Sequence, residues 1–129
     1  MRPFQRGYTM WFCFKDAFLS VVHKDCDDNE LLVRARVKGH IEAIFPEAKV
    51  KRTTGADYLY RAVLKREEVG QVLMQLTLSY AASNFKNSVK DHKLHHAYAQ
   101  VWRTMAQLQK VAPFSRGEVG KAKTSAIRP

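Results

Sequence analysis

The hydrophobic pattern of this chain changes repeatedly between a period of two and a period of 3.6, and this is its strongest constraint on the fold. Residues 31–37, LLVRARV, alternate apolar and basic side chains as a half-buried strand does. Aromatic and β-branched residues in 11–24 predict a first hairpin, and 48–53 with 56–64 predict a second one. Five strands are therefore expected.

Three other segments predict helices. Residues 39–45 form a short one that stops at Pro46, because proline cannot continue a helix. A second runs over 67–79 with two glutamates in its first turn, and a third begins after Asp91, a suitable N-cap. The order βββ-α-ββ-α-α favours an α+β fold, with an antiparallel sheet of about five strands and two or three helices packed on one face.

The last helix has the most regular apolar spacing of the chain. Seven positions follow the i, i+3, i+4, i+7 rule and predict one buried stripe. They are Leu94, Ala97, Tyr98, Val101, Trp102, Met105 and Leu108. If this helix does not pack on the sheet, the 91–109 segment is the expected seam of a homodimer.

The remaining core is expected from the helix at 67–79 and from the aromatic residues. The core face of that helix is predicted at Val69, Val72, Leu73, Leu76 and Tyr80. The aromatic core residues are predicted to be Trp11, Phe12, Phe14, Phe18, Phe45, Phe85, Tyr98 and Trp102.

Charge separates the ends of the chain from its middle. The 129 residues carry a net charge of +10, but residues 10–109 hold fifteen basic and eleven acidic side chains, so more than half of the excess lies in the ends. Residues 111–129 combine Pro, Gly, Ser and Lys without apolar periodicity and predict a flexible basic tail. We expect a single α+β domain over 10–110, preceded by an N-terminal extension at 1–9.

Cysteine content and hydropathy indicate the cellular compartment in which the protein is expected. Cys13 and Cys26 are too few for a disulfide framework, and no apolar stretch approaches the ~20 residues that a membrane span needs. No signal peptide is recognisable. A cytoplasmic protein with two reduced thiols and no membrane partner is expected.

The strongest functional indication is a basic face on the predicted sheet. In 31–37 Arg34 and Arg36 point to one side, and the other side holds Leu31, Val33, Ala35 and Val37. Lys49 and Lys51 share a face of the following strand. If the helices cover one side of the sheet, the arginine side is open to an acidic partner.

The strand at 56–64 adds to this face. Tyr58 and Tyr60 are expected on one side of it and Arg61 on the other. A solvated sheet face with scattered cross-strand ion pairs is the alternative. The predicted binding residues are Arg34, Arg36, Lys38, Lys49, Lys51 and Arg61.

Catalytic and metal-binding patterns are weaker. His92 and His96 have the i, i+4 spacing that places two imidazoles on one metal, but the glutamate of an HExxH motif is missing. No nucleophile or carboxylate lies in a recognisable catalytic motif. The acids considered are Asp16, Asp57 and Asp91, and the nucleophiles Cys13, Cys26 and Ser88. We expect the protein to have no enzymatic activity and to bind neither a metal ion nor a cofactor.

Five segments resemble a group of short bacterial and phage proteins of unassigned function. The resemblance implies a shared fold, and it carries over no catalytic or binding residue. The segments are KDAFLSVV (15–22), LLVRARVKGHIEAIFP (31–46), ADYLYRA (56–62), NFKNSV (84–89) and HHAYAQVW (95–102).

The sequence thus favours a small basic binding module without catalytic activity. Its expected partner is acidic, either nucleic acid or a protein surface. Two alternatives remain open: an inhibitor of a host defence complex, similar to anti-CRISPR proteins of phages and mobile elements, and a metal-dependent or hydrolytic enzyme built around His92 and His96.

Overall fold

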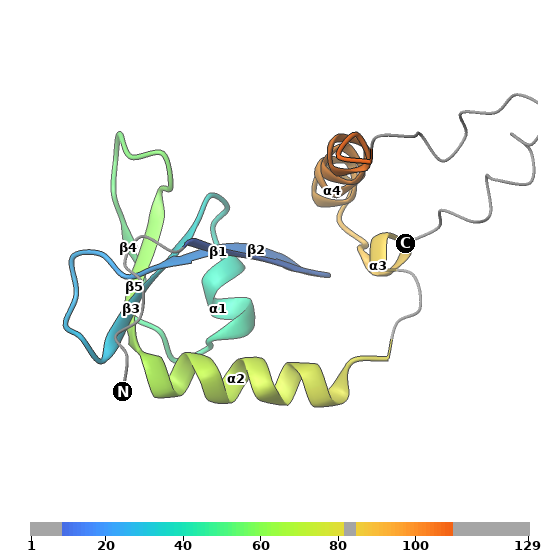
Figure 1. Ribbon diagram of the computed structural model, residues 1–129. Helices are drawn as coiled ribbons and strands as arrows, with labels where there is room; N and C mark the ends of the chain where they lie inside the picture. The colour runs from blue at the N-terminus through green and yellow to red at the C-terminus, as the bar shows by residue number, and fades with distance from the viewer. Residues whose placement is uncertain (1–8, 82–84, 110–129) are drawn as a thin grey trace, which may run out of the picture. The chain divides into compact units, whose positions relative to one another are not determined.

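The computed structural model describes residues 9–81 and 85–109, and the chain divides into two compact units, Met1–Ala81 and Ala82–Pro129 (Figure 1). The N-terminal extension expected at 1–9 lies outside the described residues except for Thr9, which begins the first strand. The basic tail expected at 111–129 lies outside them entirely. The single domain expected over 10–110 stays a prediction, which the two units by themselves do not test.

The first unit contains a five-stranded sheet in which every neighbouring pair is antiparallel. Its strands follow the order β1-β2-β3-β5-β4. Their bounds are Thr9–Phe14 (β1), Ala17–Val22 (β2), Glu30–Ala35 (β3), Lys51–Arg52 (β4) and Tyr60–Lys65 (β5). The predicted α+β class and the antiparallel sheet of five strands are confirmed.

Two helices, α1 (His40–Ile44) and α2 (Arg66–Ser79), lie on one side of this sheet (Figure 1). Both pack on β3 and β5, and α1 also packs on β2. The amide of Phe18 in β2 donates to Nδ1 of His40 at 3.1 Å, which ties the start of α1 to the sheet. Before α1 the chain turns at Gly39, whose φ of 93° favours glycine.

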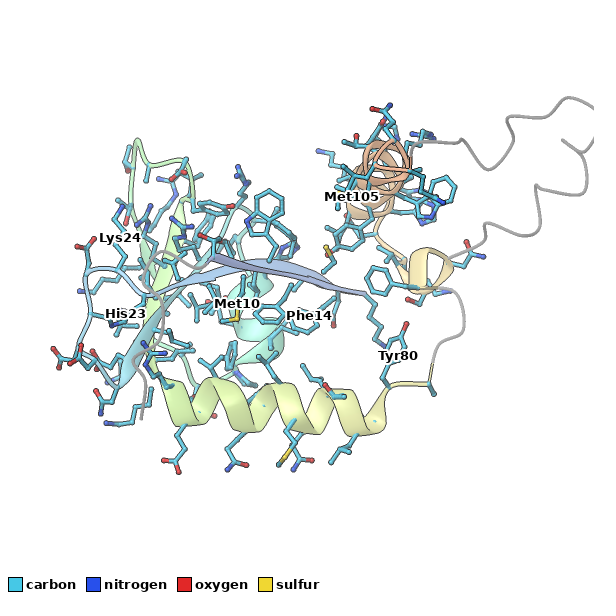
Figure 2. All side chains as sticks on the ribbon, viewed as in Figure 1. Met10, Phe14, His23, Lys24, Tyr80 and Met105 are labelled. Atoms are coloured by element: carbon cyan, nitrogen blue, oxygen red, sulfur yellow. The ribbon has the colours of Figure 1, made fainter. Side chains whose placement is uncertain are left out.

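The core lies between these helices and the sheet because the strands alternate strictly. Every second residue of β2, β3 and β5 is buried toward α1 and α2, where Phe45 and Val69 join them. The strand residues of this core are Ala17, Leu19, Val21, Leu31, Val33, Ala35, Ala62 and Leu64. Met10 and Phe14 of β1 point to the same side as the helices (Figure 2).

Two core predictions for this unit need correction. Tyr80 is exposed because α2 ends at Ser79, whereas Val69 is buried and the other three predicted residues of that face pack partly on the core. Trp11 was expected in the core and is 63% exposed. The register explains this, since Trp11 pairs with Ser20 and therefore faces away from the helices.

The second unit contains α3 (Phe85–Ser88) and α4 (His92–Ala106). As predicted, Asp91 caps α4: its Oδ2 accepts from the amide of Leu94 at 2.8 Å. The rings of Phe85 and Tyr98 are in contact, with 5.3 Å between their centroids. Phe85 therefore anchors α3 to the first turns of α4.

The stripe predicted for α4 is buried only in part. Leu94 and Tyr98 are buried, but Val101, Met105 and Leu108 are exposed. A four-residue helix is about 6 Å long and a 15-residue helix about 22 Å. The short α3 therefore covers only the beginning of the stripe.

Candidate functional site

The candidate site lies on the second face of the sheet, the face opposite α1 and α2. Its residues alternate with those of the core along each strand. They are Thr9, Trp11, Cys13, Phe18, Ser20, Val22, Glu30, Leu32, Arg34, Lys51, Arg61, Val63 and Lys65. The arginine side of 31–37 that the sequence predicted is therefore distinct from the helix-covered side.

Three basic residues of this face are aligned across three adjacent strands. Arg34 of β3 pairs with Arg61 of β5, and Arg61 pairs with Lys51 of β4. Directly paired residues have Cβ atoms about 4.5–5.5 Å apart. These three residues, here called the basic row, thus concentrate positive charge along one line.

Arg34 is held in the row by neighbours on both sides. One of its terminal guanidinium nitrogens donates to Oγ of Ser20 at 2.7 Å, and Ser20 is completely buried. Its Nε is buried without an acceptor among the described residues. A buried donor without a partner costs about 1–3 kcal/mol. The position of Arg34 is therefore maintained against a local cost, which is typical of functional sites.

Tyr58 brings a fourth cation to the row. The guanidinium carbons of Arg34 and Arg36 lie over the Tyr58 ring, 4.4 and 4.1 Å from its centroid. The ring is 4% exposed, and the Tyr58 carbonyl accepts from Nε of Arg61 at 3.2 Å. A ring face attracts cations but leaves their formal charge in place. Tyr58 therefore positions the arginines without neutralising them.

Only one carboxylate among the described residues pairs with these four cations. Asp57 lies 3.4 Å from Arg61 and its side chain is 69% exposed. An ion pair so exposed is strongly screened by water. Strands β3 and β5 pair Glu30 with Lys65 at one end, where the charges attract. At the other end they pair Arg34 with Arg61, where the charges repel.

The structure brings together four of the six predicted binding residues: Arg34, Arg36, Lys51 and Arg61. Lys38 follows β3, Lys49 precedes β4, and both are exposed outside the paired strands. Arg36 lies one residue beyond β3, which ends at Ala35 rather than at residue 37.

The placement of the two tyrosines differs from the prediction. Tyr58 and Tyr60 were expected on one face, but Tyr60 packs against the core and Tyr58 contacts the arginines. Strand β5 begins only at Tyr60, so the period of two does not extend back to Tyr58. A bend at Asp57 and Tyr58, where the amide of Tyr58 donates to Oδ1 of Asp57, redirects the ring.

Sequence reasoning missed Trp11 as a functional candidate. It lies at the β1 end of the line that holds the basic row, because Trp11 pairs with Ser20 and Ser20 pairs with Arg34. The signal was present in the alternation of 10–14, where Met10, Phe12 and Phe14 share the helix side and Trp11 does not.

The two histidines predicted as metal-binding candidates lie on α4. His92 and His96 are exposed on α4, and Nε2 of His96 lies 3.4 Å from the side-chain nitrogen of Gln100. Within 9–81 and 85–109, no three His, Cys, Asp or Glu residues come together as ligands for a metal ion. Partial burial raises the pKa of the Cys13 thiol above its ordinary value, which disfavours the nucleophilic thiolate.

Comparisons of the chain with protein-family models, with curated proteins and with solved structures found no match. The resemblance to short bacterial and phage proteins therefore stays an expectation. None of the helices in the described part of the chain is long and apolar enough to cross a membrane.

Proposed function

We propose that this protein is a binding module that engages an anionic partner through the basic row, with Arg36 beside it. One observation carries the proposal: Arg34, Arg61 and Lys51 are direct cross-strand neighbours of like charge. Like charges in direct opposition destabilise a sheet, so folding alone does not favour this arrangement. A bound anion would convert the repulsion into attraction.

The distribution of charge in the first unit supports this proposal. Residues 9–81 contain eleven Lys and Arg against ten Asp and Glu, so the described part of the unit is nearly neutral. The concentration of cations on the second face is therefore a local arrangement and does not follow from a general basic composition. Such patches attract anionic partners over a distance of about a Debye length.

The favoured partner is nucleic acid. Phosphates along its backbone repeat at short intervals, which matches cations repeated across adjacent strands. Arginine, which supplies three of the four cations, presents planar donors suited to phosphate oxygens. An acidic protein surface would use the same charges, and the test below separates the two.

The test compares two charge-reversal variants of the full chain. Arg36→Glu with Lys51→Glu changes two exposed cations of the site, and Arg34 is left intact because its contact with buried Ser20 makes it part of the fold. The matched control is Lys24→Glu with Arg52→Glu, which changes the net charge equally. Arg52 neighbours Lys51 on the opposite side of β4, and Lys24 lies in the loop after β2 (Figure 2).

Fluorescence anisotropy with labelled single-stranded DNA of about 20 nucleotides and with labelled polyglutamate, in about 0.15 M salt, provides the readout. We expect the site variant to bind DNA at least about tenfold more weakly and the control to bind within about threefold of the unchanged protein. Because each lost phosphate contact lowers the salt dependence of binding by about one unit of slope, the slope should fall by about one to two. Equal losses in both variants, or none in either, would contradict the proposal, whereas binding to polyglutamate alone would assign the site to an acidic protein.

A further inference from the structure

An exposed tryptophan extends the line of the basic row across the whole sheet. The paired residues run from Trp11 on β1 through Ser20 on β2 to Arg34, Arg61 and Lys51. Neighbouring strands are about 4.8 Å apart, so the line is roughly 19 Å long and Trp11 lies about 10 Å from Arg34. This length suits a polymer and exceeds what a single phosphate occupies.

The Trp11 ring is held in place although most of its surface is free. Its edge-on contact with Phe18, with 5.8 Å between centroids and 72° between planes, supports it from the neighbouring strand. Trp11 is nevertheless 63% exposed. A supported ring with an accessible surface can accept a stacked planar group with little loss of side-chain entropy.

The rest of the second face near Trp11 is uncharged. The next paired line across the sheet holds Thr9, Val22, Leu32 and Val63, of which Thr9 and Val63 are exposed and Val22 and Leu32 are buried. Along the line of the basic row, the face therefore carries an aromatic ring on β1 and cations on β3, β5 and β4, and the neighbouring line is uncharged. A partner with planar apolar groups attached to a polyanionic backbone fits this division better than an acidic peptide, which lacks the planar groups.

We infer that the partner is a single-stranded nucleic acid whose unpaired base stacks on Trp11 while its phosphates contact the basic row. This inference rests on the proposed function, because it assumes that the basic row binds an anion. Single strands are required because bases in a duplex already stack on one another and do not present a free face. Stacking on aromatic side chains tolerates any base, so little sequence preference is expected.

The experiment measures the fluorescence of Trp11 in the full chain carrying Trp102→Phe, which removes the second tryptophan. Four ligands of about ten units each are titrated: a thymidine decamer, a uridine decamer, a thymidine–adenosine duplex, and a sugar–phosphate decamer without bases. We expect one or both single strands to quench Trp11 and to bind on the order of tenfold more tightly than the decamer without bases. Whichever of the thymidine and uridine strands binds more tightly identifies DNA or RNA as the preferred source.

Two variants then test whether the tighter binding of single strands depends on the Trp11 ring. Trp11→Leu should weaken binding of the preferred single strand by on the order of tenfold and leave binding of the base-free decamer unchanged. Met10→Leu is the matched control, since Met10 precedes Trp11 and points to the helix side (Figure 2). Trp11→Phe should retain most of the affinity because it keeps a ring.

The outcomes separate this inference from the proposed function. Equal affinity for strands with and without bases, or binding of the duplex as tight as that of the single strands, overturns the inference and leaves the anion-binding role standing. Unchanged affinity in Trp11→Leu also overturns it. Failure of all four ligands to bind overturns the inference and excludes nucleic acid as the partner. Binding of polyglutamate then shows whether the anion-binding role still stands.

Discussion

The two faces of the sheet differ in how their side chains interact, as the adjacent residues Leu19 and Ser20 of β2 show. Leu19 is 1% exposed and belongs to the core beneath α1 and α2. Ser20 is equally buried, but its hydroxyl accepts a hydrogen bond from Arg34. The helix side combines side chains that stabilise one another, whereas the second face places like charges side by side. The like-charged neighbours of the row therefore do not stabilise the sheet, although Val22 and Leu32 of the same face are buried.

Leu19→Ala tests the helix side and should have the largest effect. Truncating a fully buried leucine removes its apolar burial and leaves a cavity, so the free energy of unfolding should fall by about 2–5 kcal/mol. Urea denaturation followed by circular dichroism measures the loss. Anion binding by the protein that remains folded should not change. A loss of stability below about 1 kcal/mol would show that the contrast between the faces is weaker than the burial indicates.

Ser20→Ala tests the second face at the neighbouring position. It removes the acceptor of the Arg34 hydrogen bond and should lower the free energy of unfolding by about 1–3 kcal/mol, as for other hydrogen bonds to charged groups. Unlike Leu19→Ala, it should also weaken DNA binding in the anisotropy assay, because the guanidinium of Arg34 loses its anchor. A variant that loses stability but binds as before would mean that Ser20 serves only the fold.

Asp57→Asn should have the smallest effect on stability and the opposite effect on binding. Its exposed ion pair with Arg61 contributes about 0–1 kcal/mol to stability, and the asparagine oxygen still accepts from the amide of Tyr58. Removing the Asp57 carboxylate beside the row should tighten DNA binding about threefold, the equivalent of ~0.7 kcal/mol. Weaker binding would instead show that Asp57 is needed to hold Arg61 in position.

The order of the strands and of α1, α2 and α4 was predictable because local patterns govern it, whereas the short helix α3 was not predicted. The alternation correctly separated Leu31, Val33 and Ala35, which enter the core, from Arg34, whereas Val37 lies beyond β3 and is exposed. The carboxylate of Asp91 caps α4 as its position before the apolar spacing indicated. These features depend on neighbours within a few residues, which a sequence displays directly.

The sequence-based predictions were wrong where a helix or strand ends, and where the residues that pack on it come from a distant segment. Strand β5 begins later than its sequence pattern suggests, so Tyr58 turns toward Arg34 and Arg36 rather than following Tyr60. On α4 the apolar spacing continues to Leu108, although α3 is too short to cover it. Periodicity identifies an apolar face of an element but not whether another element covers it.

The sequence by itself determined the fold class, the positions of most strands and helices, and the placement of Arg34 on the side of β3 away from the core, because backbone periodicity and capping act locally. Only the tertiary structure decided that Arg34, Arg61 and Lys51 are direct neighbours and that Trp11 lies on their line. Register between strands distant in sequence sets this alignment, and a shift of one residue would move each side chain to the other face. The candidate site is therefore a product of strand pairing, which no single segment of the chain encodes.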